Sequence, residues 1–205
     1  MFKYNFYKRV FDLILAIILI PILVLTFILV TPFIYFSDFG PILYYSKRIG
    51  KGGLSFTMYK YRTMKVNSPD IRLMDGSTYN SYDDIRLTFV GKILREFSID
   101  ELPQIFNILK NDMSFIGPRP DPIDWLFKYK VNEKLFLNIK PGITGYNQAY
   151  FRNDADSDLK ILNDNYYAQN ISFLFDIKIF FKTIQTIIFR TNINIKSNRL
   201  KNNHD

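Results

Sequence analysis

An uncharged run of residues dominates the N-terminal part of the sequence. It covers positions 13–37 and reads LILAIILIPILVLTFILVTPFIYFS. A straight helix of this length would reach about 37 Å, against roughly 30 Å of hydrocarbon in a bilayer. The run is longer than the apolar core of a signal peptide, and it has no small-residue cleavage site. It therefore predicts a membrane-embedded helix.

Basic residues flank this run on both sides. Those before it are Lys3, Lys8 and Arg9, and those after it are Lys47, Arg48, Lys51, Lys60, Arg62 and Lys65. Because positive charge prefers the cytoplasmic side, both flanks are expected there. Two prolines inside the run, Pro21 and Pro32, each remove a helical hydrogen bond and favour a kink or a reversal. We expect a re-entrant segment that enters and leaves by one face. The alternative is a kinked span with the remaining domain outside.

The composition narrows the chemistry that is open to the chain. Its 205 residues include no cysteine and a single histidine, His204, beside the C-terminus. This excludes a disulfide framework, a thiolate nucleophile, a cysteine-based zinc site and a Ser-His-Asp triad. The formal net charge of +8 and a pI near 9.5 suit an anionic partner, which could be nucleic acid, a phosphorylated metabolite or a lipid headgroup layer.

Behind the apolar run, the pattern predicts mixed secondary structure. Two apolar and aromatic stretches, 42–45 and 55–61, enclose a glycine-rich turn and predict a β-hairpin. Residues 67–84 are polar and predict a surface loop. Helices are expected at 87–95 and 103–110, and the stretch Gly117-Pro118-Arg119-Pro120 cannot continue the second one.

A further helix is expected at 171–190. Its apolar residues share one face: Phe173, Ile177, Phe180, Phe181, Ile184, Ile187 and Ile188. The polar residues on the opposite face are Ser172, Asp176, Thr183, Thr186 and Arg190. Such a helix can lie in the membrane interface or pack on a core, and periodicity does not distinguish the two.

Two adjacent carboxylates, Asp100 and Glu101, form the candidate chemical centre. They could belong to a capping box that starts at Ser98. Pro103 disfavours that arrangement, since a helix more naturally begins with proline at its first position. The carboxylates would then lie just outside a helix N-terminus, where they could hold Mg²⁺ and phosphates. A pair of ordinary surface acids is the alternative.

Several unusual motifs follow one another along the chain. Through them the sequence resembles the bacterial sugar transferases, the small monotopic phosphoglycosyl transferases. The resemblance runs from Lys8 to about Ile187. The motifs are KRVFD (8–12), GP (40–41), R-x-G (48–50), KYRTM (60–64), RLT (86–88), DELPQ (100–104), DMSFIGPRP (112–120) and KPGITG (140–145). One departure concerns the family's Ser-Pro break in the membrane helix, where Leu25 and Thr26 stand, so the re-entrant turn could be displaced.

The resemblance implies transfer of a sugar 1-phosphate from a UDP-sugar to a polyprenyl phosphate such as undecaprenyl phosphate, with release of UMP. It implies Mg²⁺ as cofactor, with Asp100 and Glu101 as its candidate ligands. Asp100 takes the role of the nucleophile, and Glu101 assists the metal or the lipid phosphate. A carboxylate suits this role because it is ionised at neutral pH without an activating histidine.

Cations should hold the phosphates, because a planar guanidinium can bind two phosphate oxygens at once. Arg119 and Arg152 are the leading candidates, and Arg95 lies close to the carboxylates in sequence. For Lys60 and Arg62, contact with substrate and contact with lipid headgroups are equally open.

The expected fold is therefore α+β and mainly helical. A re-entrant anchor at 1–38 precedes a compact catalytic domain at 39–190 with a small β-hairpin and amphipathic interfacial helices, and a polar tail follows at 191–205. We expect the domain on the cytoplasmic face of a bacterial inner membrane, with a UDP-sugar, a polyprenyl phosphate and the membrane as partners and no nucleic acid. The oligomeric state stays open. The competing class is a non-enzymatic, membrane-anchored basic binding module, which would tolerate loss of Asp100.

Overall fold

A computed structural model describes residues 2–73, 79, 81, 84–127, 129, 134–151 and 155–189. The tail expected at 191–205 lies outside these residues. The α-helices are α1 (Phe2–Asp38), α2 (Phe89–Glu96), α3 (Ile105–Leu109), α4 (Tyr146–Tyr150), α5 (Ser157–Gln169) and α6 (Phe173–Ile188). The strands are β1 (Leu43–Ile49), β2 (Ser55–Tyr61), β3 (Ser114–Ile116) and β4 (Gly142–Thr144), and the 3₁₀ turns are η1 (Lys51–Gly53), η2 (Ile99–Gln104), η3 (Ile123–Phe127) and η5 (Leu135–Asn138).

The apolar run forms one continuous helix, α1, that is bowed rather than broken. Both prolines lie inside it, and the missing proline donors are a common cause of helix bending. Within the described part of the chain, α1 is the one helix long and apolar enough to cross a membrane, and 11% of its most apolar window is buried. A core helix would be largely buried, so this exposure favours contact with lipid.

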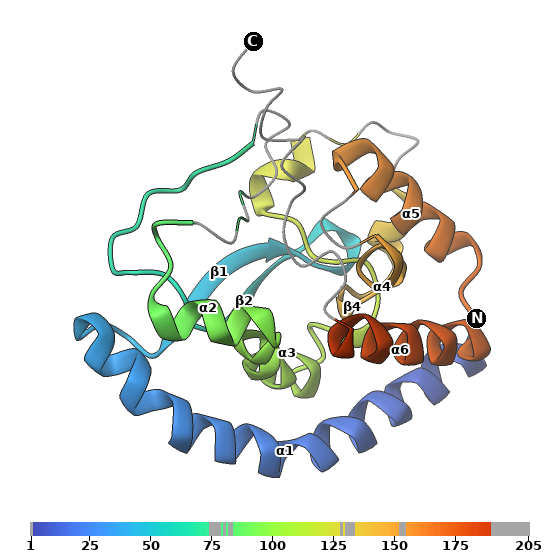
Figure 1. Cartoon of the computed structure of the whole chain (residues 1–205). Coiled ribbons are helices and arrows are strands. Elements are labelled where there is room, and N and C mark those ends of the chain that lie inside the picture. Colours follow the sequence, from blue (N-terminus) through green and yellow to red (C-terminus); the bar gives the residue numbers. More distant parts are fainter. Residues whose placement is uncertain are drawn as a thin grey trace.

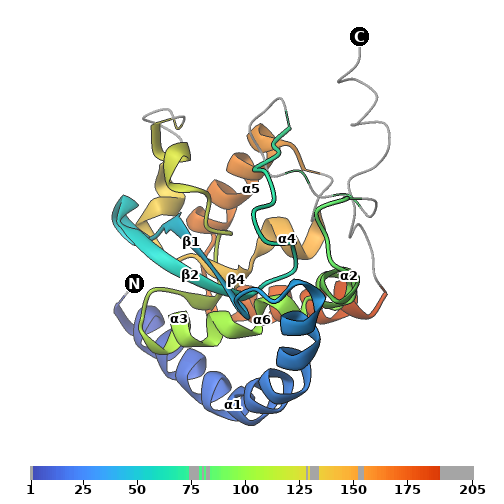
Figure 2. The ribbon, with the colours of Figure 1, turned by 90° about the vertical axis from the view of Figure 1, so that its left-hand side faces the viewer.

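Both ends of α1 are held by the same domain. Near the start, Lys8 Nζ lies 2.6 Å from Asp176 Oδ2 on α6. At the other end, Arg62 binds Asp38. Between them, Ala16, Leu23 and Ile34 enter the main apolar core. Figure 1 shows α1 as an arc beneath the domain, and in both views α2, α3 and α6 form a layer above it (Figures 1 and 2).

Two small sheets complete the architecture. β1 and β2 form the expected antiparallel hairpin, which pairs Leu43 with Tyr61 and Ile49 with Ser55. β3 and β4 pair in parallel, and this second sheet was not anticipated from the sequence. Parallel pairing joins segments that are distant in the chain, so no local turn motif in the sequence predicts it. The helix expected at 87–95 is present as α2, and residues 67–73 run without helix or strand.

α6 turns its polar side inward and its apolar side outward. Asp176 is 5% exposed and Thr186 is 7% exposed, whereas Phe181 on the apolar side is 64% exposed. A helix on the surface of a soluble domain buries its apolar side. The reversed orientation favours the membrane-interface alternative for α6, although Ile179 and Phe180 also pack on the core.

Candidate active site

Asp100 and Glu101 lie in the 3₁₀ turn η2 rather than outside a helix. Ser98 precedes this turn at a φ of 57°, and its side chain makes no capping bond, so the capping box is not formed. The expectation that the helix begins at Pro103 is also wrong, since η2 begins at Ile99 and α3 follows it. The fixed φ of proline fits the interior of a 3₁₀ turn, which explains the early start.

Two cations share one oxygen of Glu101. Lys60 Nζ lies 2.6 Å from Oε1, and Arg119 Nη2 lies 2.6 Å from the same atom. Burial alone would raise the pKa of Glu101. The charges and hydrogen bonds of Arg119 and Lys60 outweigh it and hold that pKa well below its usual range. Glu101 is therefore ionised, and its charge is neutralised within the site.

Asp100 lies in a different environment from its neighbour. Its side chain is buried, and its Oδ2 is 3.6 Å from Lys60 Nζ. Burial raises the pKa of Asp100 above its usual value, against the opposing charges of Lys60 and the nearby arginines. Glu101 is thus paired with two cations, while burial disfavours the charged form of the adjacent Asp100. Such a difference between neighbouring carboxylates is typical of catalytic acids with separate roles.

Asn107 on α3 binds the backbone of the strand that carries Lys60. Its Nδ2 donates to Thr57 O at 2.7 Å, and its Oδ1 accepts from Tyr59 N at 3.1 Å. Both partners are on β2, the strand that carries Lys60. This fully buried amide joins β2 to α3, the helix that directly follows the carboxylate turn η2.

The short parallel sheet positions Arg119. Gly117 N donates to Thr144 O at 2.8 Å, and Gly142 N donates to Pro118 O at 2.9 Å. The two chains approach so closely that a Cβ on Gly145 would lie 2.0 Å from Gly117 O. The glycines of the two motifs, GPRP and KPGITG, therefore allow the contact that holds the Arg119 turn.

Asp100, Glu101, Lys60 and Arg119 line a cleft of about 1480 Å³. Its wall carries several cations: Arg48, Lys60, Arg95, Arg119 and Lys160. Arg48 and Lys160 were not among the candidates from the sequence. Arg48 belongs to the R-x-G motif, which could have marked it. Lys160 has Asp164 four residues on, which from sequence alone resembles an ordinary helical ion pair.

The other candidate cations occupy different places. Arg95 lies on α2, lines the cleft and donates from Nε to Thr63 Oγ1 at 3.0 Å, and burial lowers its pKa. Arg152 lies outside the described residues. Arg62 also lines the cleft, but its guanidinium binds the end of α1 and the neighbouring backbone and makes no contact with the carboxylates Asp100 and Glu101 among the described contacts.

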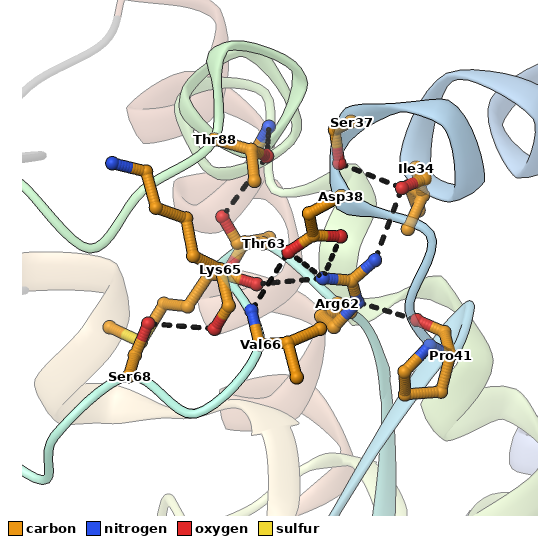
Figure 3. A network of polar contacts seen from close by, with 12 residues as sticks. Ile34, Ser37, Asp38, Pro41, Arg62, Thr63, Lys65, Val66, Ser68 and Thr88 are labelled. Carbon is orange, nitrogen blue, oxygen red and sulfur yellow. Dashed lines mark hydrogen bonds and ion pairs between the residues drawn. The ribbon is translucent and has the colours of Figure 1, made fainter.

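Figure 3 shows how the end of α1 encloses Arg62. Nη1 lies 2.6 Å from Asp38 Oδ2, Nη2 donates to Ile34 O at 3.1 Å, and Nε donates to Pro41 O at 2.5 Å. Asp38 Oδ2 also accepts from Val66 N at 2.8 Å. All three guanidinium nitrogens thus have partners, which ties the last turn of α1 to the end of β2.

The geometry agrees with a comparison of the whole chain with known families. The family described as bacterial sugar transferase matches residues 3–190. The chain belongs to this family. The match extends across α1, the hairpin, the carboxylate turn and α6, so the membrane helix and the cleft are both parts of the sugar transferase unit.

Three relatives indicate what members of the family do. The chain is 38% identical, over 90% of its length, to the UDP-N-acetylgalactosamine-undecaprenyl-phosphate N-acetylgalactosaminephosphotransferase of Aeromonas hydrophila. It is 36% identical, over 91% of its length, to the undecaprenyl-phosphate galactose phosphotransferase of Salmonella typhimurium. It is also 38% identical, over 88% of its length, to the exopolysaccharide production protein ExoY of Sinorhizobium fredii. The matches cover 44%, 41% and 84% of these relatives, so the chain spans less than half the length of the first two.

Proposed function

We propose that this chain is a phosphoglycosyl transferase that moves a sugar 1-phosphate from a UDP-sugar to undecaprenyl phosphate and releases UMP. The observation that carries the proposal is the pair of unlike carboxylates, a buried Asp100 beside a doubly paired Glu101, in a cationic cleft. The names of the two sugar phosphotransferases among the relatives supply the substrate class.

The proposed reaction consists of two successive displacements at the β-phosphorus of the UDP-sugar. A carboxylate oxygen of Asp100 attacks the β-phosphorus of the UDP-sugar, and the bond from that phosphorus to the bridging oxygen breaks. UMP leaves with the bonding electron pair. A phosphate oxygen of the lipid then attacks the same phosphorus, the bond to Asp100 breaks, and the free carboxylate is restored.

Glu101 and its two cations bind and orient the anionic groups. Arg119 keeps 40% of its side chain exposed while it contacts Glu101, so its guanidinium can also meet a phosphate oxygen. Lys60 lies between both carboxylates, where its charge stabilises the leaving phosphate. Arg95 adds a further positive charge to the cleft.

Mg²⁺ fits the donors of this cleft. The ion commonly binds one or two carboxylates together with substrate phosphates, and Asp100 and Glu101 offer adjacent carboxylates. The described residues contain no group of three or more histidine, aspartate or glutamate side chains that could hold a metal on their own. Substrate phosphates would therefore complete the coordination, and the bound ion would screen the charge of the diphosphate.

We place the cleft on the cytoplasmic side of the inner membrane. Support comes from α1, whose two ends are bound to one domain, and from the basic residues on both sides of the apolar run. A helix held in this way enters and leaves the bilayer by the same face. A UDP-sugar would arrive from the cytosol and the lipid phosphate from the membrane.

The covalent intermediate tests the proposal directly. Purified protein is incubated with Mg²⁺ and each of a panel of UDP-sugars, and its intact mass is measured. We expect a gain equal to one sugar phosphate for one donor, and loss of that gain when undecaprenyl phosphate is added. Asp100→Asn should give no gain and release no UMP, while Glu101→Gln should acquire the adduct more slowly.

Asp158→Asn on the exposed surface of α5 serves as the control and should behave as the parent. A parent that turns over without an adduct, with kinetics that require both substrates bound together, would replace this mechanism by direct transfer. No UMP release with any donor would reject the transferase proposal and favour the binding module.

A further inference from the structure

A second cluster of buried charges adjoins the Arg119 turn. Lys160 on α5 lies 2.7 Å from Asp121 Oδ2 and 2.9 Å from Asp164 Oδ2. Tyr129 donates its hydroxyl to the same Asp121 oxygen at 2.5 Å. Asp121 and Asp164 are buried, and neither belongs to the carboxylate pair of the active site.

The ammonium of Lys160 has three donors, and each has a protein acceptor. Two contact the aspartates, and the third reaches the backbone oxygen of Arg119 at 3.4 Å. Burial alone would lower the pKa of Lys160, but Asp121 and Asp164 outweigh it and raise that pKa, so the side chain stays charged. Lys160 lines the cleft without a donor to spare for a phosphate.

These contacts hold the backbone on both sides of Arg119. Pro118 and Pro120 already restrict the turn, because proline fixes its own φ and limits the residue before it. The backbone oxygen of Asp121 also accepts from Ile49 N at 2.9 Å, which ties the turn to the end of β1. Lys160 joins the Arg119 carbonyl to the Asp121 carboxylate and attaches both to α5.

We infer that Lys160 is a positioning residue, which aims the Arg119 guanidinium at Glu101 and at the substrate phosphates through the Asp121 contact. This inference rests on the proposed function for its catalytic consequence, but the geometry of Arg119 can be measured without any substrate. An ammonium with every donor occupied acts through the groups it holds, and the group that it holds in the cleft is Arg119.

A double-mutant cycle tests the catalytic part. Lys160→Met removes the charge and keeps the length of the side chain, and it should lower kcat/KM for the UDP-sugar about tenfold or more. In an Arg119→Lys background the same change should lower it less than about twofold, because the interaction that it supports is already lost. If Lys160→Met lowered kcat/KM by the same factor in the parent and in Arg119→Lys, the inference would be overturned, since Lys160 would then act independently of Arg119.

A spectroscopic measurement tests the geometric part. Protein labelled with [¹⁵N]arginine should give a resolved Arg119 Nε–Hε signal, assigned by its absence in Arg119→Lys. In Lys160→Met this signal should shift and broaden, and in Lys160→Arg it should keep the position seen in the parent. An unchanged signal in Lys160→Met would also overturn the inference. If the parent transfers no sugar, the proposed function fails, and this measurement still decides whether Lys160 positions Arg119.

Two controls separate positioning from folding. Lys160→Arg restores the charge and the donors, so it should recover most of the kcat/KM lost in Lys160→Met. Lys110→Met removes a lysine that contacts Tyr59 outside the cleft, and it should leave both kcat/KM and the Arg119 signal unchanged. Recovery of stability without recovery of activity in Lys160→Arg would contradict the positioning role.

Discussion

Lys60 and Arg119 donate to the same atom, Glu101 Oε1, each across 2.6 Å. The adjacent Asp100 is left with a longer contact, 3.6 Å, to Lys60 alone of these two cations. The two neighbouring acids therefore differ in their effect on folding as well as in their proposed chemistry. Ionisation of Glu101 stabilises the folded protein, whereas ionisation of Asp100 destabilises it.

Asp100→Asn should stabilise the protein at neutral pH. A carboxyl whose pKa is raised by folding binds its proton more tightly when folded, so its ionisation destabilises the fold as the pH rises above the unfolded value of about 3.9. The melting temperature of Asp100→Asn should be higher than that of the parent at pH 7. For a chain of this size, each 1 kcal/mol in the free energy of unfolding shifts the melting temperature by about 2–4 °C. Below pH 4 the two proteins should melt at the same temperature.

Glu101→Gln should have the opposite effect. Its lowered pKa means that ionised Glu101 adds stability, which is fully present above the unfolded value of about 4.3 and is lost as the pH falls through the folded pKa. Thermal unfolding of both variants across a pH series measures the two signs. Equal shifts in the same direction at pH 7 would contradict the difference between the two environments.

Arg62→Gln should destabilise the attachment of α1 strongly. The change leaves Asp38 without its buried partner and removes bonds to three backbone oxygens, those of Ile34, Pro41 and Met64. Breaking a buried ion pair costs about 3–5 kcal/mol. Arg72→Gln is the matched control. Arg72 pairs with two aspartates, Asp70 and Asp124, but these are largely exposed, so the loss should stay below about 1 kcal/mol. Denaturation in lipid nanodiscs compares the two, and similar losses would show that Arg62 does not hold the helix.

Gly91→Ala should displace α2 and the Arg95 that it carries. A Cβ at this position would lie 1.9 Å from the backbone oxygen of Thr63, so the helix must move away. Overpacking of this kind costs about 1–3 kcal/mol, and UMP release should fall with it. Gly52→Asn is the control, because Gly52 has a φ of +71° with open space around its Cβ position, and asparagine tolerates that conformation. Wild-type stability in Gly91→Ala would refute the close packing.

The residues on either side of the apolar run should be accessible from the same side of the membrane. The chain has no cysteine of its own, so single cysteines can replace Lys3 and Lys47 without interference. An impermeant maleimide should label both in opened cells and neither in intact cells. A cysteine at Ile22, near the middle of α1, should be protected in both. Labelling of positions 3 and 47 from opposite sides would exclude the re-entrant arrangement.

Phe181→Asp should weaken membrane association. Phe181 lies on the outward apolar side of α6, and an aspartate there would be driven from the lipid interface. Phe127→Asp is the control, since Phe127 is more exposed but belongs to η3, on the side of the domain away from α1 (Figures 1 and 2). Flotation with liposomes after deletion of residues 1–38 compares the two variants. Equal recovery with liposomes would show that α6 does not contact lipid.

Local patterns predicted much of the fold. The charge-free run predicted α1, the glycine turn between two aromatic stretches predicted the hairpin, and the apolar spacing predicted α6. Periodicity assigns residues to a common side of a helix but does not say which side meets solvent, so the inward polar side of α6, with Asp176 and Thr186, needed the packing. Proline at the first position is a start signal of α-helices, so it does not predict a 3₁₀ turn such as η2, which begins at Ile99 and holds Pro103 inside it.

The candidate site, like the fold, could be predicted from the sequence only in part. Asp100, Glu101, Lys60 and Arg119 were named from motifs, and the structure brings them together. Lys160 could not be named, because its contacts with Asp121 and the Arg119 carbonyl join positions about forty residues apart, and only the fold creates them. Arg62 shares a motif with Lys60, but it follows the last residue of β2, and its guanidinium binds Asp38 and the Ile34 carbonyl of α1. Only the fold shows this contact, because it joins residues more than twenty positions apart.

α6 is both a wall of the cleft and an exposed apolar surface. Thr183 and Thr186 line the cleft from one side of this helix, while Phe181 and Ile188 project from the other. A single helix with its side chains is about 10–12 Å across, so on the proposed function no thicker barrier separates the reacting phosphates from the hydrocarbon at this wall. The acceptor can present its headgroup to the enzyme while its long isoprenoid chain stays dissolved in the bilayer. Turnover then avoids solvent exposure of that chain, which would oppose transfer by about 0.8 kcal/mol for every methylene withdrawn from the lipid.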